Sequence, residues 1–114
     1  MSELELQNAV IDLARVLGYR VAHFRAARTA DGWRTPVAAD GAGFPDLVLV
    51  KRRVIFAELK SAAGKLRAEQ SEWRISLQAA GAEYRLWNPD SWVSGEIEDC
   101  LARETTWATR KPRS

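Results

Sequence analysis

The sequence predicts an α/β fold, because helical and extended segments alternate along its 114 residues. Two segments have the periodicity of amphipathic helices, at residues 3–17 and 67–80, and shorter segments between and after them alternate like strands. A chain of this length buries one hydrophobic core rather than two. We therefore expect a single domain over residues 1–104, followed by a loosely held basic tail at 105–114.

Composition narrows the class of protein. Apolar residues make up 46% and charged residues 28% of the chain, as is usual for a globular protein. Cys100 is the only cysteine, which excludes an intramolecular disulfide and thiolate-rich zinc sites. No apolar run has the length of a signal peptide or membrane span, so we expect a cytoplasmic protein with no membrane partner. A net charge of +2 makes only a mild case for nucleic-acid binding.

The first helix is expected over residues 3–17, with Ser2 as its N-cap and Gly18 as its end. Residues 19–24 then alternate like a strand. The apolar stripe of the helix has helical spacing and consists of Leu6, Val10, Leu13, Ala14 and Leu17.

Residues 25–44 contain several glycines and a proline and lack a sustained period of either kind. Within them Arg25, Arg28 and Arg34, with Trp33, have the side chains that grip phosphate and stack on a base or sugar of DNA. A solvated loop that happens to be charged explains the same residues, and the sequence favours neither interpretation.

Residues 46–50 and 54–60 read as two strands joined by a basic turn. If the turn centres on Arg52, antiparallel pairing places Asp46 opposite Glu58, and Lys60 lies on the same face as Glu58. The other face of both strands is also apolar, which predicts a hairpin at the centre of the sheet.

The second helix is expected over residues 67–80, ending at Gly81, with Gln70 as the polar exception on its inner face. Residues 83–87 read as a strand, Asn88-Pro89 as a turn, and residues 94–103 as a last helix capped by Ser94. The expected order is α-β-β-β-α-β with a final helix, forming a central mixed sheet flanked by helices.

Two carboxylates facing each other near an apolar interior repel unless a proton or cation compensates them. Mg²⁺ suits Asp46 and Glu58, with the backbone carbonyl of Leu59 as a third ligand, and Mn²⁺ should substitute. Such a site can hydrolyse phosphodiesters, with Lys60 positioning water or offsetting developing charge. A buried salt bridge between Lys60 and one carboxylate is the competing interpretation.

Three further features favour a functional site. A bend at residues 43–45 would fix the entry of Asp46 into its strand. Helix geometry places Glu3 at the edge of the inner stripe of the first helix, and Gln70 faces inward from the second. Together they suggest a polar site bordered by both helices.

These motifs, GFPDLV at residues 43–48, FAELK at 56–60 and the later Gln70, resemble the VRR-NUC group of the PD-(D/E)XK nuclease superfamily. The likeness spans residues 2–92. It implies a restriction-endonuclease-like nuclease domain that depends on Mg²⁺ or Mn²⁺, with Asp46, Glu58 and Lys60 as the catalytic trio and Glu3 and Gln70 as further site residues. Compact phage and bacterial members of the group imply a homodimer that cuts branched DNA, such as Holliday junctions or flaps.

Other functions fit parts of the same pattern. A catalytically silent module could hold DNA without cutting it, and an interaction domain could use the charges as ion pairs. A sequence-specific restriction-type endonuclease would need base-reading elements, for which a chain of 114 residues has little room. The single histidine, His23, is better read as structural or as a phosphate contact than as a catalytic base.

Overall fold

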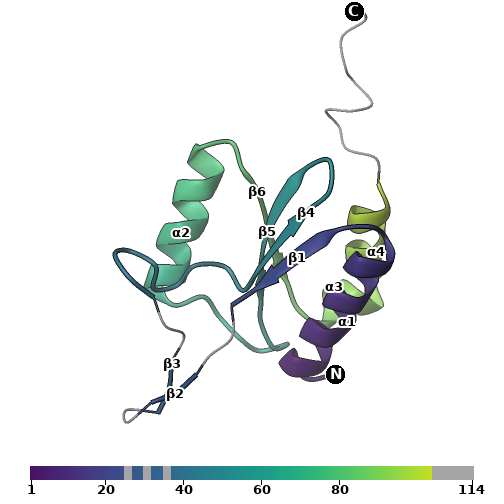
Figure 1. Cartoon of the computed structure of the whole chain (residues 1–114). Helices are drawn as coiled ribbons and strands as arrows, with labels where there is room; N and C mark the ends of the chain where they lie inside the picture. The colour runs from purple at the N-terminus through teal and green to yellow at the C-terminus, as the bar shows by residue number, and fades with distance from the viewer. Residues whose placement is uncertain (25–26, 30–31, 35–36, 104–114) are drawn as a thin grey trace, which may run out of the picture.

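In the computed structural model, the chain forms an α/β fold with helices on both faces of a four-stranded mixed sheet (Figure 1). The structure describes residues 1–24, 27–29, 32–34 and 37–103. The strand order is β1-β4-β5-β6, in which β5 pairs antiparallel with β4 and parallel with β6. The predicted hairpin therefore lies at the centre of the sheet. The bounds of these strands are β1 (Arg20–His23), β4 (Leu47–Val50), β5 (Val54–Leu59) and β6 (Glu83–Trp87).

The first helix, α1 (Glu3–Val16), begins and ends where the sequence predicts. The Ser2 hydroxyl accepts a hydrogen bond from the Glu5 N–H, and the Glu5 carboxylate accepts one from the Ser2 N–H, which forms a complete capping box. After the helix, Gly18 has a φ of +94°, a conformation that favours glycine. The capping box and this glycine therefore fix the length of α1.

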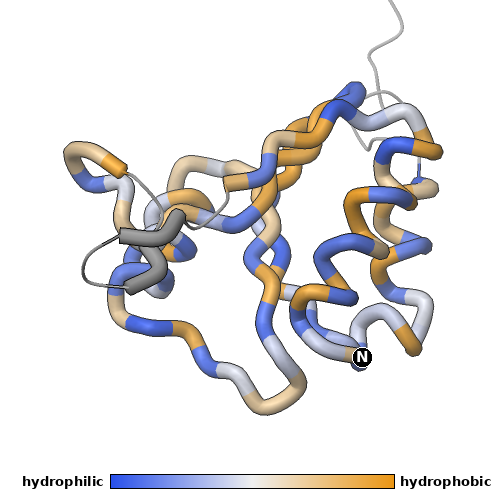
Figure 2. Tube along the Cα trace, turned by 60° about the horizontal axis from the view of Figure 1, so that its bottom comes forward, coloured by the Kyte–Doolittle hydropathy of each residue, from blue (hydrophilic) through white to orange (hydrophobic). Residues whose placement is uncertain are grey.

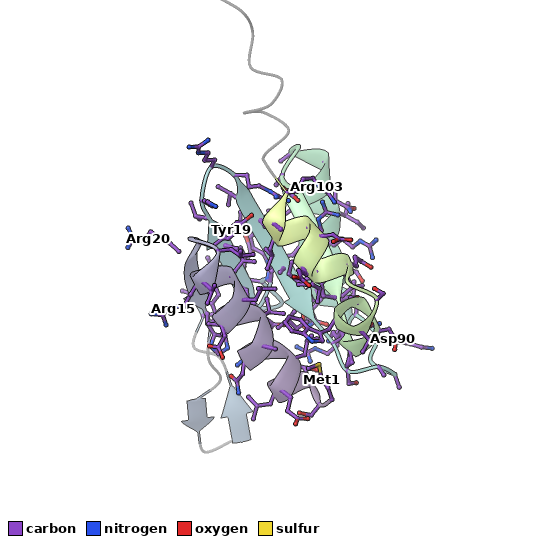
Figure 3. All side chains as sticks on the ribbon, turned by 90° about the vertical axis from the view of Figure 1, so that its right-hand side faces the viewer. Met1, Arg15, Tyr19, Arg20, Asp90 and Arg103 are labelled. Carbon is purple, nitrogen blue, oxygen red and sulfur yellow. The ribbon has the colours of Figure 1, made fainter. Side chains whose placement is uncertain are left out.

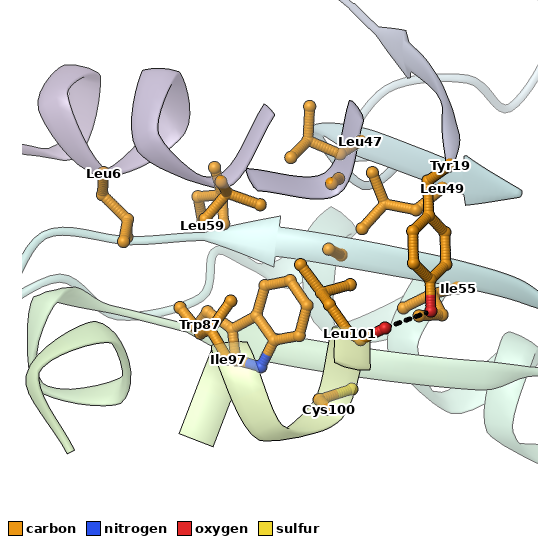
Figure 4. Close-up of a cluster of buried hydrophobic side chains, with 13 residues drawn as sticks. Leu6, Tyr19, Leu47, Leu49, Ile55, Leu59, Trp87, Ile97, Cys100 and Leu101 are labelled. Carbon is orange, nitrogen blue, oxygen red and sulfur yellow. Dashed lines mark hydrogen bonds between the residues drawn. The ribbon is translucent and has the colours of Figure 1, made fainter. Parts of the chain in front are cut away.

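The main core lies between the sheet and the helices α1, α3 (Pro89–Val93) and α4 (Glu96–Ala102) (Figure 4). Tyr19 crosses this layer, and its hydroxyl donates a hydrogen bond to the Leu101 carbonyl at 2.9 Å. Figure 2 shows the central strands as nearly continuous hydrophobic segments, whereas α1, next to the N-terminus, alternates with the period of its buried stripe. The largest core side chains are Trp87, Leu6, Leu47, Leu49, Ile55, Leu59, Ile97 and Leu101.

The opposite face of the sheet is covered by α2 (Ala68–Ala79) through a cluster of aromatic rings. The Phe44 ring makes edge-to-face contacts with Phe24, Phe56 and Trp73, with ring centroids 5.0 to 6.0 Å apart. Gly43, with a φ of +83°, lies so close to α2 that an added Cβ would be 2.6 Å from the Glu69 backbone. The bend that leads into β4 therefore packs directly against the first turn of α2.

Three local predictions are wrong. Within the segment expected to lack regular structure, β2 (Ala27–Thr29) and β3 (Gly32–Arg34) form a short antiparallel hairpin, too brief to show a period in sequence. Asn88-Pro89 begins α3, because the Asn88 side chain caps the helix and proline is compatible with its first position. Ser94 ends α3, and Gly95, with a φ of +85°, takes the N-cap position of α4, although the Ser94 hydroxyl accepts a hydrogen bond from the Glu96 N–H at 3.3 Å.

The predicted tail at residues 105–114 lies outside the described residues. Among the helices that the structure describes, none is long and apolar enough to span a membrane.

Candidate active site

The register of the central hairpin brings the two predicted carboxylates together. Val48 pairs with Phe56 and Val50 with Val54, so the turn centres on Arg52 as expected. Continuing this register places Asp46 opposite Glu58. The Asp46 carboxylate Oδ2 accepts a hydrogen bond from the Leu59 N–H at 2.8 Å, which anchors it to the end of β5.

Glu58 is the most deeply buried ionisable side chain of this site, at 2% exposed. Gln70, 7% exposed, donates from its Nε2 to the Glu58 Oε2 at 3.0 Å. The Gln70 Oε1 accepts the Arg67 backbone N–H at 2.8 Å. Because that N–H can only donate, it turns the amide NH₂ of Gln70 toward Glu58. The prediction that Gln70 faces inward is confirmed, and its amide is oriented by the start of α2.

The electrostatics of Glu58 are those of an uncompensated acid. Burial, then the charge of Asp46 and a hydrogen bond to Asp46, raise the pKa of Glu58 to about 8. Lys60 opposes this rise, and Glu3 adds to it. At neutral pH the carboxylate pair therefore holds a proton unless a cation takes its place.

Lys60 does not form the salt bridge that the competing interpretation requires, and Glu3 lies at the surface. The half-buried Lys60 has no carboxylate oxygen within 4.0 Å among the described residues. Glu3 is exposed in the first turn of α1, ahead of the buried stripe that packs on the sheet. Its charge nevertheless acts on Glu58.

The structure adds Tyr84 and Arg74, which the sequence interpretation missed. The Tyr84 hydroxyl is buried without a hydrogen-bond partner among the described residues. Burial raises the pKa of Tyr84 to about 12, with Glu58 and Asp46 contributing, so the hydroxyl stays protonated next to the carboxylates. The Arg74 guanidinium lies 5.7 Å from the Tyr84 ring centroid. Strand alternation suggests the face that Tyr84 occupies, but the parallel register that brings it near Glu58 has no sequence signal.

The donor set fits a hard divalent cation better than a soft one, since it consists of carboxylate oxygens without histidine or thiolate. In the described part of the chain, no group of three or more His, Cys, Asp or Glu side chains is placed to hold a metal ion. Asp46 and Glu58 supply two carboxylates, so the other ligands of a metal ion held there would have to be water or phosphate. The Leu59 carbonyl stays an expectation, because the structure ties Leu59 to the site through its N–H.

The predicted DNA contacts Arg25, Arg28, Trp33 and Arg34 lie in a segment whose side chains are outside the described residues. No family model, curated protein or solved structure matches this chain. The function therefore has to be inferred from the geometry and electrostatics of the site.

Proposed function

We propose that this chain is a metal-dependent nuclease that hydrolyses phosphodiester bonds in DNA. The observation that carries the proposal is the pair formed by Asp46 and Glu58: Glu58 is buried, has no ion pair among the described residues, and has its pKa raised to about 8 by burial and by Asp46. Buried acids that are perturbed by one another concentrate at functional sites, whereas structural carboxylates are paired with cations.

Each residue of the site has a role in this proposal. Asp46 and Glu58 would hold Mg²⁺ or Mn²⁺, which when bound supplies Lewis acidity at the phosphodiester. Gln70 keeps the Glu58 carboxylate in one orientation through its amide. Lys60, free of carboxylate partners in the described structure, is available to orient the attacking water or to offset charge that develops on the phosphate.

The nuclease family, the DNA substrate and the oligomeric state are part of the same proposal. The resemblance to the VRR-NUC group, the order of the motif residues and the mixed sheet are all in keeping with a restriction-endonuclease-like nuclease. We propose branched DNA as the substrate and a homodimer as the active form, because a second subunit would grasp a second arm of a junction.

The test is a cleavage assay on labelled four-way junction, flap and linear duplex DNA. The wild type is compared with Glu58→Gln and with Glu72→Gln, the same substitution at an exposed position of α2. With about 5 mM Mg²⁺ or Mn²⁺, wild type and Glu72→Gln should cut a branched substrate, while Glu58→Gln and all samples in EDTA should not.

Two results would contradict the proposal. Equal cleavage by wild type and Glu58→Gln would mean that the activity does not come from this site. DNA binding without cleavage under every metal condition would instead indicate a catalytically silent binding module. Cleavage confined to one duplex sequence would retain the nuclease and replace branched DNA by a restriction-type substrate.

A further inference from the structure

Three basic side chains meet where α1 joins β1, and we call Arg15, Arg20 and Lys51 the basic corner. All three are exposed. Arg15 lies in the last turn of α1, and Arg20 begins β1 opposite Val50, the residue before Lys51. Figure 3 shows Arg15 and Arg20 projecting on the same side of the molecule. This corner is therefore a local concentration of positive charge.

Lys51 is held in place rather than free in solvent. Its Nζ donates to the Leu17 carbonyl at 2.8 Å and lies 5.8 Å from the Tyr19 ring centroid. These contacts fix the ammonium at the α1–β1 connection. An ordered cation loses less conformational entropy on binding an anion than a mobile lysine does.

The charges of the basic corner are not neutralised within the described structure. Neither Arg15, Arg20 nor Lys51 has a carboxylate within ion-pair distance there, and even Asp12, one turn before Arg15 on α1, makes no pair with it. The same chain does neutralise Arg53 and Arg85, which share Glu83. The corner thus presents its charge to an external anion.

We propose that the basic corner binds the phosphate backbone of a DNA duplex arm, as a second contact beyond the carboxylate site. The proposal rests on the proposed function for the identity of the polyanion. Val50, paired with Arg20, is four residues from Asp46, a distance of about 13 Å along the strand. This corresponds to about four base pairs of DNA, so one duplex can contact both places. Guanidinium groups suit phosphate because they bind it bidentately.

Two structural roles compete with DNA binding at this corner. Arg15 interacts favourably with the C-terminal dipole of α1. Arg20 places a charge on the edge strand β1, which discourages pairing with another sheet. These roles predict changes in melting temperature or association when the charges are removed. They predict no change in the salt dependence of DNA binding.

The experiment measures anisotropy of a labelled duplex of about 20 base pairs in EDTA, from roughly 50 to 200 mM salt. It compares wild type with Arg15→Gln/Arg20→Gln, with the charge-retaining Arg15→Lys/Arg20→Lys, and with Arg103→Gln, an exposed arginine on the far end of α4 (Figure 3). We expect the slope of log affinity against log salt to become shallower by about 1 to 2 in the glutamine double variant. The lysine double variant and Arg103→Gln should keep the wild-type slope.

An unchanged slope in a glutamine double variant with wild-type melting temperature would overturn the proposal. So would a wild type that fails to bind duplex at the lowest salt, or one that binds phosphatidylserine vesicles in preference to DNA. If the glutamine double variant does not fold, Arg20→Gln alone should reduce the slope by about 1, and an unchanged slope overturns the proposal equally. Because EDTA prevents cleavage, loss of the proposed nuclease activity leaves this test intact.

Discussion

The two ends of the central hairpin each have an acidic side chain, and the electrostatic surroundings of these two acids are opposite. Beside the turn, burial would raise the pKa of Glu83, but hydrogen bonds from Arg53 at 2.6 Å and Arg85 at 2.8 Å outweigh burial and lower it. At the other end, burial and the acidic neighbour Asp46 together raise the pKa of Glu58 to about 8. Glu83 is paired with two guanidinium groups, whereas Glu58 has no ion pair among the described residues.

This contrast distinguishes the structural role of Glu83 from the functional role that we propose for Glu58. The Glu83 cluster ties β6 to the hairpin turn and to α4, because Arg53 also donates to the Cys100 carbonyl at 2.8 Å. Asp46 and Glu58 accept hydrogen bonds from the Leu59 N–H and the Gln70 amide, but neither forms an ion pair with a cationic side chain among the described residues. The chain neutralises Glu83 with two guanidinium groups, whereas under the proposed function the Asp46–Glu58 pair would be compensated by a bound cation.

The largest effect is expected when Glu58 is given a cationic neighbour, as Glu83 has. Asp46→Lys should replace the carboxylate pair by an ion pair like that of Glu83 and so lower the pKa of Glu58. The rate of cleavage should fall by roughly a thousandfold or more. Circular dichroism should show a folded protein. Cleavage of branched DNA at the wild-type rate by a folded Asp46→Lys protein would remove Asp46 from the catalytic site.

The converse change removes one of the two arginine partners of Glu83. Arg53→Met should lower the free energy of unfolding by about 3 to 5 kcal/mol, because the partly buried Glu83 would be left with the half-buried Arg85 as its one ion-pair partner among the described residues. Urea denaturation at neutral pH measures the loss. Arg53→Met/Glu83→Leu is the matched control and should recover much of the stability. A loss below about 1 kcal/mol in the single variant would mean that the cluster is not structural.

A third prediction concerns pH in metal-free buffer. Because the pKa of Glu58 is raised from 4.5 to about 8, the folded chain holds a proton that the unfolded chain releases within this window. Stability should therefore fall as pH rises from about 5 to 8, by roughly 2 to 4 kcal/mol. Thermal melts of Glu58→Gln should lack this decline. A wild-type stability that is flat or rising over the same range would show that Glu58 is not the buried acid described.

The smallest expected effect is that of Gln70, which touches Glu58 from α2. Gln70→Ala should slow cleavage by about tenfold, as substitutions of residues that orient a metal ligand do. Gln78→Ala, at an exposed position of the same helix, serves as the control. If both variants cleave at the wild-type rate, Gln70 is a packing residue.

The positions of Asp46, Glu58 and Gln70 could be predicted from local sequence. The Asp46–Glu58 pairing follows from a short turn, because antiparallel partners around a turn have a constant sum of residue numbers. Gln70 could be placed from helical periodicity alone. Both arguments use neighbours in sequence, for which secondary-structure geometry determines position.

The rest depends on contacts between distant segments. The Arg53–Glu83 pair and the position of Tyr84 follow from the parallel register of β5 and β6, which no turn fixes. The position of Glu3 was predicted from its angle around an ideal helix. The exposure of a side chain at the end of a helix depends instead on how far the sheet extends beneath that end. Tertiary packing, which periodicity does not encode, decided each of these cases.

The most direct measurement is a calorimetric titration of Mn²⁺ into metal-free protein at about pH 7, below the raised pKa of Glu58. Titrations in buffers of different ionisation enthalpy count the protons released. The carboxylate pair predicts Mn²⁺ binding to wild type with release of close to one proton, and no such binding to Glu58→Gln. Absence of binding to wild type, or identical binding to Glu58→Gln, would contradict a cation site at Asp46 and Glu58.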